Sequence, residues 1–305
     1  MGRRNYAVAL SMLLLGKCGA GCVPTIAGPE PSATVLAAVV VQPGTTAAAT
    51  TVTTPVTPPP VTVAATTVTP TTAANTPVIT APELPTASQA HFATLPPGSA
   101  LPSDLGCAER VRSTPEIRPA NATYNHTVGT GSTAGAPRVT GNYAGTTDEI
   151  IQWVACKWGL DEDIIRAQIA KESWWYQTSG GDYTTDQSAC HPLLRTSSGP
   201  CPESIGLVQV RYLYHSQAFV NNNAINSSAY NLDYTYSLMR ACFDGESTWL
   251  NTVARGAQYT AGDVWGCLGV WYSGRWYTDA ANGYIAAVQQ NLNTRVWASS
   301  SFRNS

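Results

Sequence analysis

The sequence predicts a mostly α-helical domain over residues 146–295, preceded by a long segment without a regular apolar pattern. From Thr146 onward, apolar residues recur at the three- and four-residue spacing of a helix, whereas alternating strand patterns are nearly absent. Residues 28–102 consist mainly of Thr, Ala, Val and Pro and carry almost no charge. These two compositions divide the 305-residue chain into a linker and a part long enough to bury its own core.

Residues 1–27 are predicted to be a secretion signal. Arg3 and Arg4 give a positively charged start, an apolar run follows at 6–15, and mostly small residues follow at 16–21. The apolar run is too short to cross a bilayer as a helix. Cys22 would be the point of lipid attachment, although residues 19–21 lack the leucine expected three positions before such a cysteine. We therefore expect export, with membrane anchoring through a lipidated Cys22 left open.

The linker, residues 28–102, is expected to be disordered. Its frequent proline and threonine favour an extended, solvated backbone over a packed core. One interpretation is a spacer between the site of export and a thick cell wall, and Ser/Thr-rich stalks of this kind are often glycosylated. The alternative is a tether of no particular purpose.

The helices are predicted in chain order after an irregular lead-in, residues 103–145. A capping-box pattern at residues 146–149 opens the first helix, and Gly159 ends it. A second helix runs from Asp161 to about Trp174. Three further helices are predicted from their apolar spacing, at residues 231–243, 261–272 and 279–293. Residues 296–305 form a short tail.

Six cysteines lie beyond the signal, and an even number in an exported chain indicates disulfides, with fifteen connectivities open. Proximity in the sequence favours Cys190–Cys201, closing a loop, and Cys242–Cys267, joining two helices. Cys107–Cys156 is then the remaining pair. A zinc site at Cys190, His191 and Cys201 lacks a fourth ligand at a recognisable spacing, so we expect no metal and no other cofactor.

The charge of the chain limits its partners. Charged residues make up 12% of the sequence and the net charge is −2, so nothing predicts binding to nucleic acid or to an anionic membrane surface. Aromatic rings and neutral hydrogen-bonding groups remain, and these suit a carbohydrate ligand. We expect the protein to be a monomer.

Glu172 is the strongest catalytic candidate. It shares one face of the second predicted helix with Ile165 and Ile169, at spacings of four and three residues. Desolvation on an apolar stripe raises the pKa of a carboxyl group, as a general acid near neutral pH requires. Trp174 and Trp175 follow directly and would supply apolar walls or sugar-stacking surface. Taken alone, a glutamate near a helix end is more often a capping or surface group.

Five segments in order resemble the soluble lytic transglycosylase and goose-type lysozyme superfamily. Residues 171–175 (KESWW) resemble its Glu-Ser motif, and residues 204–210 (SIGLVQV) its Ser-x-Gly-Leu-Met-Gln-Ile segment. Asn231 resembles the asparagine that leads a helix in the family. Residues 271–274 (WYSG) are similar to its Tyr-Asn-Ala-Gly motif, and residues 284–288 (YIAAV) to its closing Tyr-Val motif.

This resemblance covers about half the chain and implies a lysozyme-like fold with Glu172 as the sole catalytic acid/base. It also implies that Tyr272 hydrogen-bonds or positions the Glu172 carboxyl and that Asn231 holds a helix start or contacts a sugar acetamido group. The residues expected to bind substrate are Ser173, Ser204, Gly206, Gln209, Asn231, Tyr272, Trp174 and Trp175. Two departures stand out: 34 residues separate Glu172 from Gly206, which exceeds the family's spacing, and Ser273 replaces an asparagine. The excess contains Cys190 and Cys201, which indicates a disulfide-closed loop near the cleft.

The activity implied by the resemblance is cleavage of peptidoglycan glycan strands outside the cytoplasm. A lytic transglycosylase needs one carboxyl group and forms a 1,6-anhydro end. Asp182 and Asp186 keep a second reaction open, because they follow Glu172 where goose-type lysozymes carry water-positioning aspartates. Hydrolysis of the same bond is therefore the alternative, and a non-catalytic peptidoglycan-binding module is a third interpretation.

Overall fold

The computed structural model describes residues 90–305, apart from residues 132, 134–135 and 253–257. These residues all belong to one compact unit. The predicted signal, Cys22 and the linker up to residue 89 lie outside the described residues. No helix within the described part is long and apolar enough to cross a membrane.

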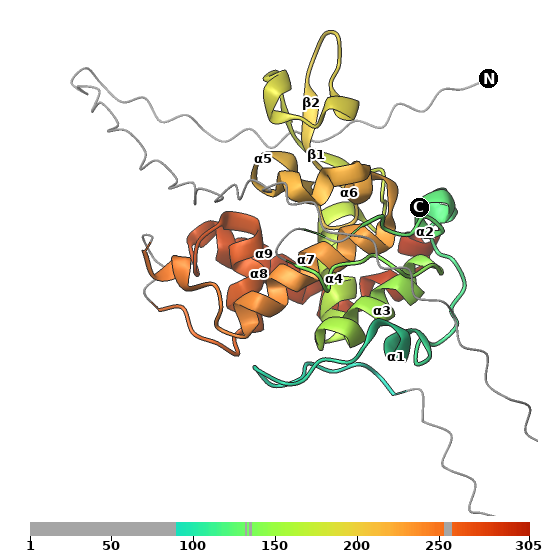
Figure 1. Cartoon of the computed structure of the whole chain (residues 1–305), viewed down its shortest axis with the longest axis vertical. Helices are drawn as coiled ribbons and strands as arrows, with labels where there is room; N and C mark the ends of the chain where they lie inside the picture. The colour runs from blue at the N-terminus through green and yellow to red at the C-terminus, as the bar shows by residue number, and fades with distance from the viewer. Residues whose placement is uncertain (1–89, 132, 134–135, 253–257) are drawn as a thin grey trace, which may run out of the picture. The chain divides into compact units, whose positions relative to one another are not determined.

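The fold is mostly α, as predicted, with 53% of the described residues in helices and 7% in strands. Figure 1 shows the longer helices packed side by side in one body. The α-helices are α1 (Asp104–Ala108), α2 (Ala122–Asn125), α3 (Thr147–Trp158), α4 (Glu162–Ser173), α5 (Tyr212–His215), α6 (Asn223–Asn226), α7 (Ser228–Phe243), α8 (Val264–Ser273), α9 (Asp279–Thr294) and α10 (Ser300–Arg303). Short 3-10 turns cover Pro119–Asn121, Gln187–Ala189, Pro192–Leu194, Ser216–Asn222, Thr248–Thr252 and Val296–Ala298.

The local signals that start and stop α3 and α4 act as the sequence predicts. The Thr146 hydroxyl accepts a hydrogen bond from the Glu149 amide, and the Glu149 carboxylate accepts one from the Thr146 amide, which completes the capping box. Gly159 ends α3 with a φ of 57°, a conformation that glycine adopts without steric penalty. The Asp161 carboxylate caps α4.

The core is formed where α4 packs against α3 and α9 and where α7 packs against α3 and α8. A buried ion pair joins α3 to α7: Lys157 Nζ lies 2.8 Å from Asp233 Oδ2, and neither side chain is accessible to solvent. The Trp158 indole donates a hydrogen bond to the other Asp233 oxygen. Because each polar group is paired, the core tolerates both charges.

A three-stranded antiparallel sheet was not predicted. It consists of β1 (Gly180–Thr184), β2 (Cys201–Ile205) and β3 (Val210–Arg211), in that order, with Gly181 opposite Ser204. The strands are short, and β2 is buried along nearly its whole length, so no polar and apolar alternation marks it. The sheet and the long loop between β1 and β2 stand at one end of the domain (Figure 1).

The three disulfides are paired as the sequence favours. Cys190–Cys201 closes the loop between β1 and β2, Cys242–Cys267 joins α7 to α8, and Cys107–Cys156 ties α1 to α3. The irregular lead-in is therefore pinned to the helical core by its cysteine, as expected.

Both predicted boundaries of the folded domain are wrong. Residues 90–102, assigned to the linker, pack on it: Phe92 is buried, and its carbonyl accepts a hydrogen bond from the Glu162 amide. Arg240 of α7 donates hydrogen bonds to the carbonyls of Leu95 and Pro96. Residues 296–305, assigned to a tail, contain the fully buried Phe302. Isolated aromatic residues in polar segments carry no period, so their burial depends on the tertiary fold.

Candidate active site

Glu172 lies in the last turn of α4 and is partly buried. Ile169 and Ile165, one and two turns earlier on the same face, are buried in the core. The apolar stripe that the sequence predicts therefore exists, and it brings the Glu172 carboxyl to the edge of the core.

A tyrosine from α9 holds the carboxyl group of Glu172. The Tyr284 hydroxyl donates a hydrogen bond to Glu172 Oε1 at 2.5 Å. Tyr272 was expected to hydrogen-bond or position this carboxyl group, but the hydrogen bond comes from Tyr284. Tyr272 stacks instead on the Tyr284 ring, with ring centroids 4.7 Å apart and planes 3° apart, and its own ring is 56% exposed. Tyr272 thus buttresses the tyrosine that contacts Glu172 and presents a flat face to solvent.

The pKa of Glu172 is raised to about 7. Burial is the largest cause, because a poorly solvated carboxylate is disfavoured. The hydrogen bond from Tyr284 and the charge of Lys171 lower the pKa, the charge of Asp182 raises it, and a hydrogen bond from Trp271 lowers it. Burial outweighs the stabilising partners, so both protonation states of Glu172 are populated near neutral pH.

The turn that follows β2 is built on Asn231. Gly206 has a φ of 92°, and a Cβ atom there would lie 2.2 Å from Asn231 Nδ2. The Asn231 amide donates hydrogen bonds to the carbonyls of Ile205 and Ala224 and accepts one from the Val208 amide. Asn231 is fully buried within α7, so it supports the turn, and the contact with a sugar considered for it is wrong.

Two further residues expected to bind substrate are also structural. The buried Ser173 hydroxyl donates a hydrogen bond to the Leu207 carbonyl at 2.8 Å, which ties the end of α4 to the turn. The Ser204 side chain is buried in β2 and donates to Asp182 Oδ2 at 2.5 Å.

Gln209 remains a candidate for ligand contact. It is partly buried, and its side-chain amide donates hydrogen bonds to the carbonyls of Ser179 and Gly206. Its Oε1 lies against Gly181 of β1, where a Cβ atom would come within 2.4 Å. Gln209 therefore joins the turn to the sheet, with its amide nitrogen committed to the backbone.

The two aspartates proposed to position water differ in their surroundings. Asp182 is exposed on β1 and acts electrostatically on Glu172. Asp186 caps the turn at Gln187–Ala189 and accepts hydrogen bonds from the Ser188 amide and hydroxyl at 2.9 and 2.6 Å. Asp182 is the aspartate that the fold brings toward Glu172, and Asp186 stabilises the loop.

Trp174 and Trp175 do not form a sugar-stacking surface. Trp175 is fully buried, and its indole donates a hydrogen bond to the Arg166 carbonyl. The Trp174 ring packs on Phe302, with ring centroids 4.6 Å apart. The sugar-stacking assignment is wrong for Trp175, which the fold buries completely, whereas Trp174 is partly buried and packs on Phe302.

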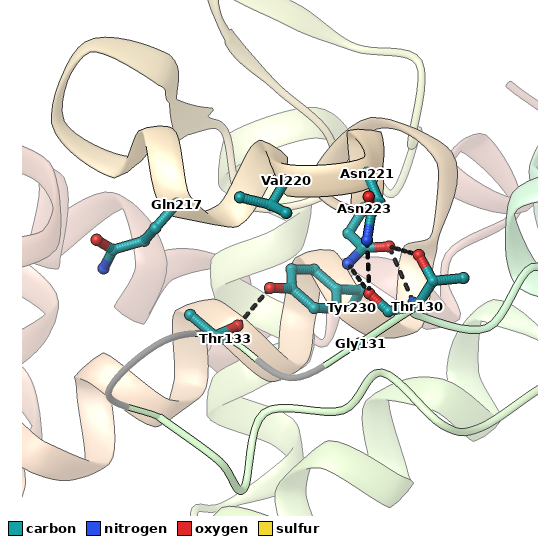
Figure 2. A pocket seen from close by; sticks show the side chains of 8 residues that line it. All are labelled: Thr130, Gly131, Thr133, Gln217, Val220, Asn221, Asn223 and Tyr230. Atoms are coloured by element: carbon teal, nitrogen blue, oxygen red, sulfur yellow. Dashed lines mark hydrogen bonds between the residues drawn. The ribbon is translucent and has the colours of Figure 1, made fainter. Parts of the chain in front are cut away.

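Two cavities lie elsewhere on the domain. Figure 2 shows a cavity of about 150 Å³ in which Asn221 and Asn223 hydrogen-bond to Thr130, and Tyr230 to Thr133. Most of the polar groups that line this cavity are hydrogen-bonded to one another. The second, of about 290 Å³, lies beside Arg112 and Arg166 at the other end of α4. Neither is lined by Glu172.

One group of side chains has the spacing of metal ligands within the described part of the chain: His91, Glu162 and Asp163. Glu162 is hydrogen-bonded to both Arg112 and Arg166. Two guanidinium groups on one carboxylate leave it without the free negative charge that a cation needs, so these residues do not fit a metal site.

Four residues around Glu172 were missed by the sequence analysis: Tyr284, Gln168, Tyr236 and Trp271. Tyr284 begins the segment that resembles the closing Tyr-Val motif, residues 284–288, but it was not assigned to the site. Gln168 lies one turn before Glu172 on α4 and accepts a hydrogen bond from the Tyr236 hydroxyl at 2.9 Å. Its four-residue spacing from Glu172 was the available signal.

Comparisons with protein families, with curated proteins and with solved structures give no match to this chain.

Proposed function

We propose that this protein is a lysozyme-like peptidoglycan lytic transglycosylase that cleaves the bond between N-acetylmuramic acid and N-acetylglucosamine. One observation carries the proposal. A partly buried glutamate, hydrogen-bonded by a tyrosine, has a pKa of about 7 at the end of a core helix. A group poised between its two protonation states can serve as acid in one step and as base in the next.

In the first step, the protonated Glu172 carboxyl donates its proton to the glycosidic oxygen. The bond from that oxygen to the muramoyl C1 breaks, and the N-acetylglucosamine hydroxyl leaves. The acetamido oxygen of the muramoyl unit stabilises the cationic C1, so the enzyme needs no nucleophile. Tyr284 donates a hydrogen bond to the carboxylate that remains and limits the cost of forming it.

In the second step, the Glu172 carboxylate accepts the proton of the muramoyl C6 hydroxyl. The O6 atom bonds to C1, the 1,6-anhydro ring closes, and Glu172 is protonated again. The exposed face of Tyr272 offers an apolar surface for a sugar ring beside this carboxyl group. Gln209, at the turn after β2, is a further candidate for contact with the sugar.

Hydrolysis of the same bond is the second candidate function. Most glycoside hydrolases use two carboxyl groups, and Asp182 is an exposed carboxylate that acts electrostatically on Glu172. A water molecule held by Asp182 would attack C1 in place of the C6 hydroxyl. A non-catalytic binding module is a third reading, but it gives no reason for a carboxyl group with a raised pKa.

We also propose that the protein works outside the cytoplasm, at the cell wall. Three disulfides are typical of an oxidising compartment, and they agree with the predicted secretion signal. The partner would be the glycan strand itself. Lipid attachment at Cys22 is a separate proposal that mass analysis of the mature protein would test.

Digestion of purified peptidoglycan followed by mass analysis tests the activity. Anhydro ends, lighter than reducing ends by one water, are the expected product. In a transglycosylase, Asp182→Asn should keep the same product and lose little of the rate, whereas a hydrolase should lose most of its turnover. Asp186→Asn is the matched control, since Asp186 only caps its loop. Reducing ends that disappear in Asp182→Asn would establish the hydrolase, and no cleavage by the folded parent would refute both.

A further inference from the structure

The helix that carries Glu172 ends in a turn of unusual backbone geometry. Trp174 and Trp175 both have positive φ angles, of 55° and 65°. Bulky residues rarely adopt this region, and they keep it only where the surrounding structure holds them there. Two such residues in succession begin two positions after Glu172. The course of the chain at this helix end therefore depends on what packs against the two tryptophans.

The C-terminal segment, residues 300–305, packs against both of them. Phe302 is fully buried, and the centroid of its ring lies 4.6 Å from that of Trp174 and 5.3 Å from that of Trp175. The Trp174 indole donates a hydrogen bond to the Ser305 hydroxyl at 2.9 Å. The Tyr176 hydroxyl donates another to the Ser305 carbonyl at 2.6 Å.

Arg118 closes the same cluster from the lead-in. Its guanidinium lies 4.2 Å from the centre of the Phe302 ring and 4.9 Å from that of Tyr176. Its Nε donates a hydrogen bond to the Trp174 carbonyl at 2.9 Å. Arg118 is only 1% exposed, so this cation is held inside the protein by the aromatic rings and backbone carbonyls.

We propose that Arg118 and residues 300–305 form a clamp that positions Glu172 for the proposed reaction, with Phe302 as its central positioning residue. The clamp holds the left-handed turn, and the turn fixes the last residues of α4. When the clamp opens, the two tryptophans return to ordinary backbone angles, the end of α4 frays, and water reaches the Glu172 carboxyl. This inference rests on the proposed function for its catalytic consequence, but not for its effect on Glu172 itself.

The groups that act on Glu172 come from elements outside the clamp, so opening the clamp changes mainly the burial of the carboxyl. Because burial is the largest cause of its raised pKa, that pKa should fall. The groups concerned are Tyr284 on α9, Trp271 on α8, Tyr236 on α7, Asp182 on β1 and Lys171 on α4 itself.

The test is an NMR titration of the full chain labelled with ¹³C at the glutamate carboxyls. Three proteins are compared with the parent: Phe302→Leu, a chain ending at Asn304, and Arg303→Ala. Phe302→Leu keeps apolar volume but loses the ring contacts, and the shortened chain loses both hydrogen bonds to Ser305. Arg303 is exposed on the same short helix and serves as the matched control.

In the first two proteins the pKa of Glu172 should fall by about one unit, and kcat should fall on the order of tenfold with KM little changed. Arg303→Ala should match the parent. If Phe302→Leu does not fold, the shortened chain decides. Folded variants whose Glu172 titration and kcat equal those of Arg303→Ala would overturn the clamp. A parent that cleaves no glycan while the titration still shifts would refute the proposed function and leave the clamp standing.

Discussion

The two ends of α4 each carry a glutamate, and the fold shifts the pKa values of these two carboxyl groups in opposite directions. Glu162 in the first turn is buried and Glu172 in the last turn is partly buried, and in each case burial raises the pKa. At Glu162, hydrogen bonds and charges from Arg112 and Arg166 outweigh burial and lower the pKa to about 2. At Glu172, Tyr284 and the more weakly acting Lys171 do not, and the pKa stays near 7.

The helix itself adds to this contrast. Its dipole favours a negative charge at the first turn and disfavours one at the last. Glu162 is therefore a permanently charged structural group, and Glu172 is a group that can exchange its proton near neutral pH. Position in the sequence does not separate the two glutamates, whereas the partners that the fold supplies do.

The largest effect expected from this difference is on activity. Glu172→Gln keeps the size of the side chain but removes the exchangeable proton, so glycan cleavage should fall by about 10²–10⁴-fold or more. Clearing of a peptidoglycan suspension measures it, with circular dichroism to confirm folding. Glu162→Gln is the control and should keep its activity while folded. Near-parental cleavage by folded Glu172→Gln would move the chemistry to another residue.

The next effect is on stability, and it concerns Glu162. A folded-state pKa below the unfolded value of about 4.5 contributes stability above that pH, and this stability is lost as the pH falls toward 2. Glu162→Gln should therefore lower the free energy of unfolding by roughly 2–3 kcal/mol at pH 7. Urea unfolding should show the difference disappearing near pH 2. If the free energies of unfolding of Glu162→Gln and the parent differed by the same amount at every pH, the loss of stability would come from altered packing and not from the charge of Glu162.

The contribution of Glu172 to the free energy of unfolding should depend on pH in the opposite direction. Its folded-state pKa lies above the unfolded value of 4.5, so its stabilising contribution is complete below pH 4.5 and is lost as the pH rises through about 7. Glu172→Gln should therefore be more stable than the parent at pH 8, by about 1–3 kcal/mol. The two proteins should unfold alike at pH 4. Thermal unfolding at both values measures this, and a less stable variant at pH 8 would contradict the raised pKa.

The smallest effect concerns the partner of Glu172. Tyr284→Phe removes a hydrogen bond that lowers the Glu172 pKa, so that pKa should rise by roughly half a unit to one unit. The pH above which cleavage declines should move upward by the same amount. Tyr272→Phe keeps the ring stack and should leave this pH unchanged. A downward shift in Tyr284→Phe would show that water replaces the lost hydroxyl.

The sequence predicted the elements whose signals are local. The capping box at Thr146 and the stop at Gly159 lie within the helix that they bound, so backbone sterics and nearby hydrogen bonds were enough to place it. The stripe from Ile165 to Glu172 follows from helical geometry alone. Pairing of Cys190 with Cys201 was predictable because few residues separate them.

The tertiary structure decided which side chains meet. Tyr284, rather than Tyr272, reaches Glu172 because α9 packs against α4, and no local pattern encodes that contact. Trp174 and Trp175 pack against the C-terminal segment for the same reason, and Trp175 is fully buried there. Local sequence thus determined that a glutamate would stand on an apolar stripe. The chemical character of that glutamate follows from burial and from distant partners, because a pKa depends on everything within a few ångströms in space, whatever its distance along the chain.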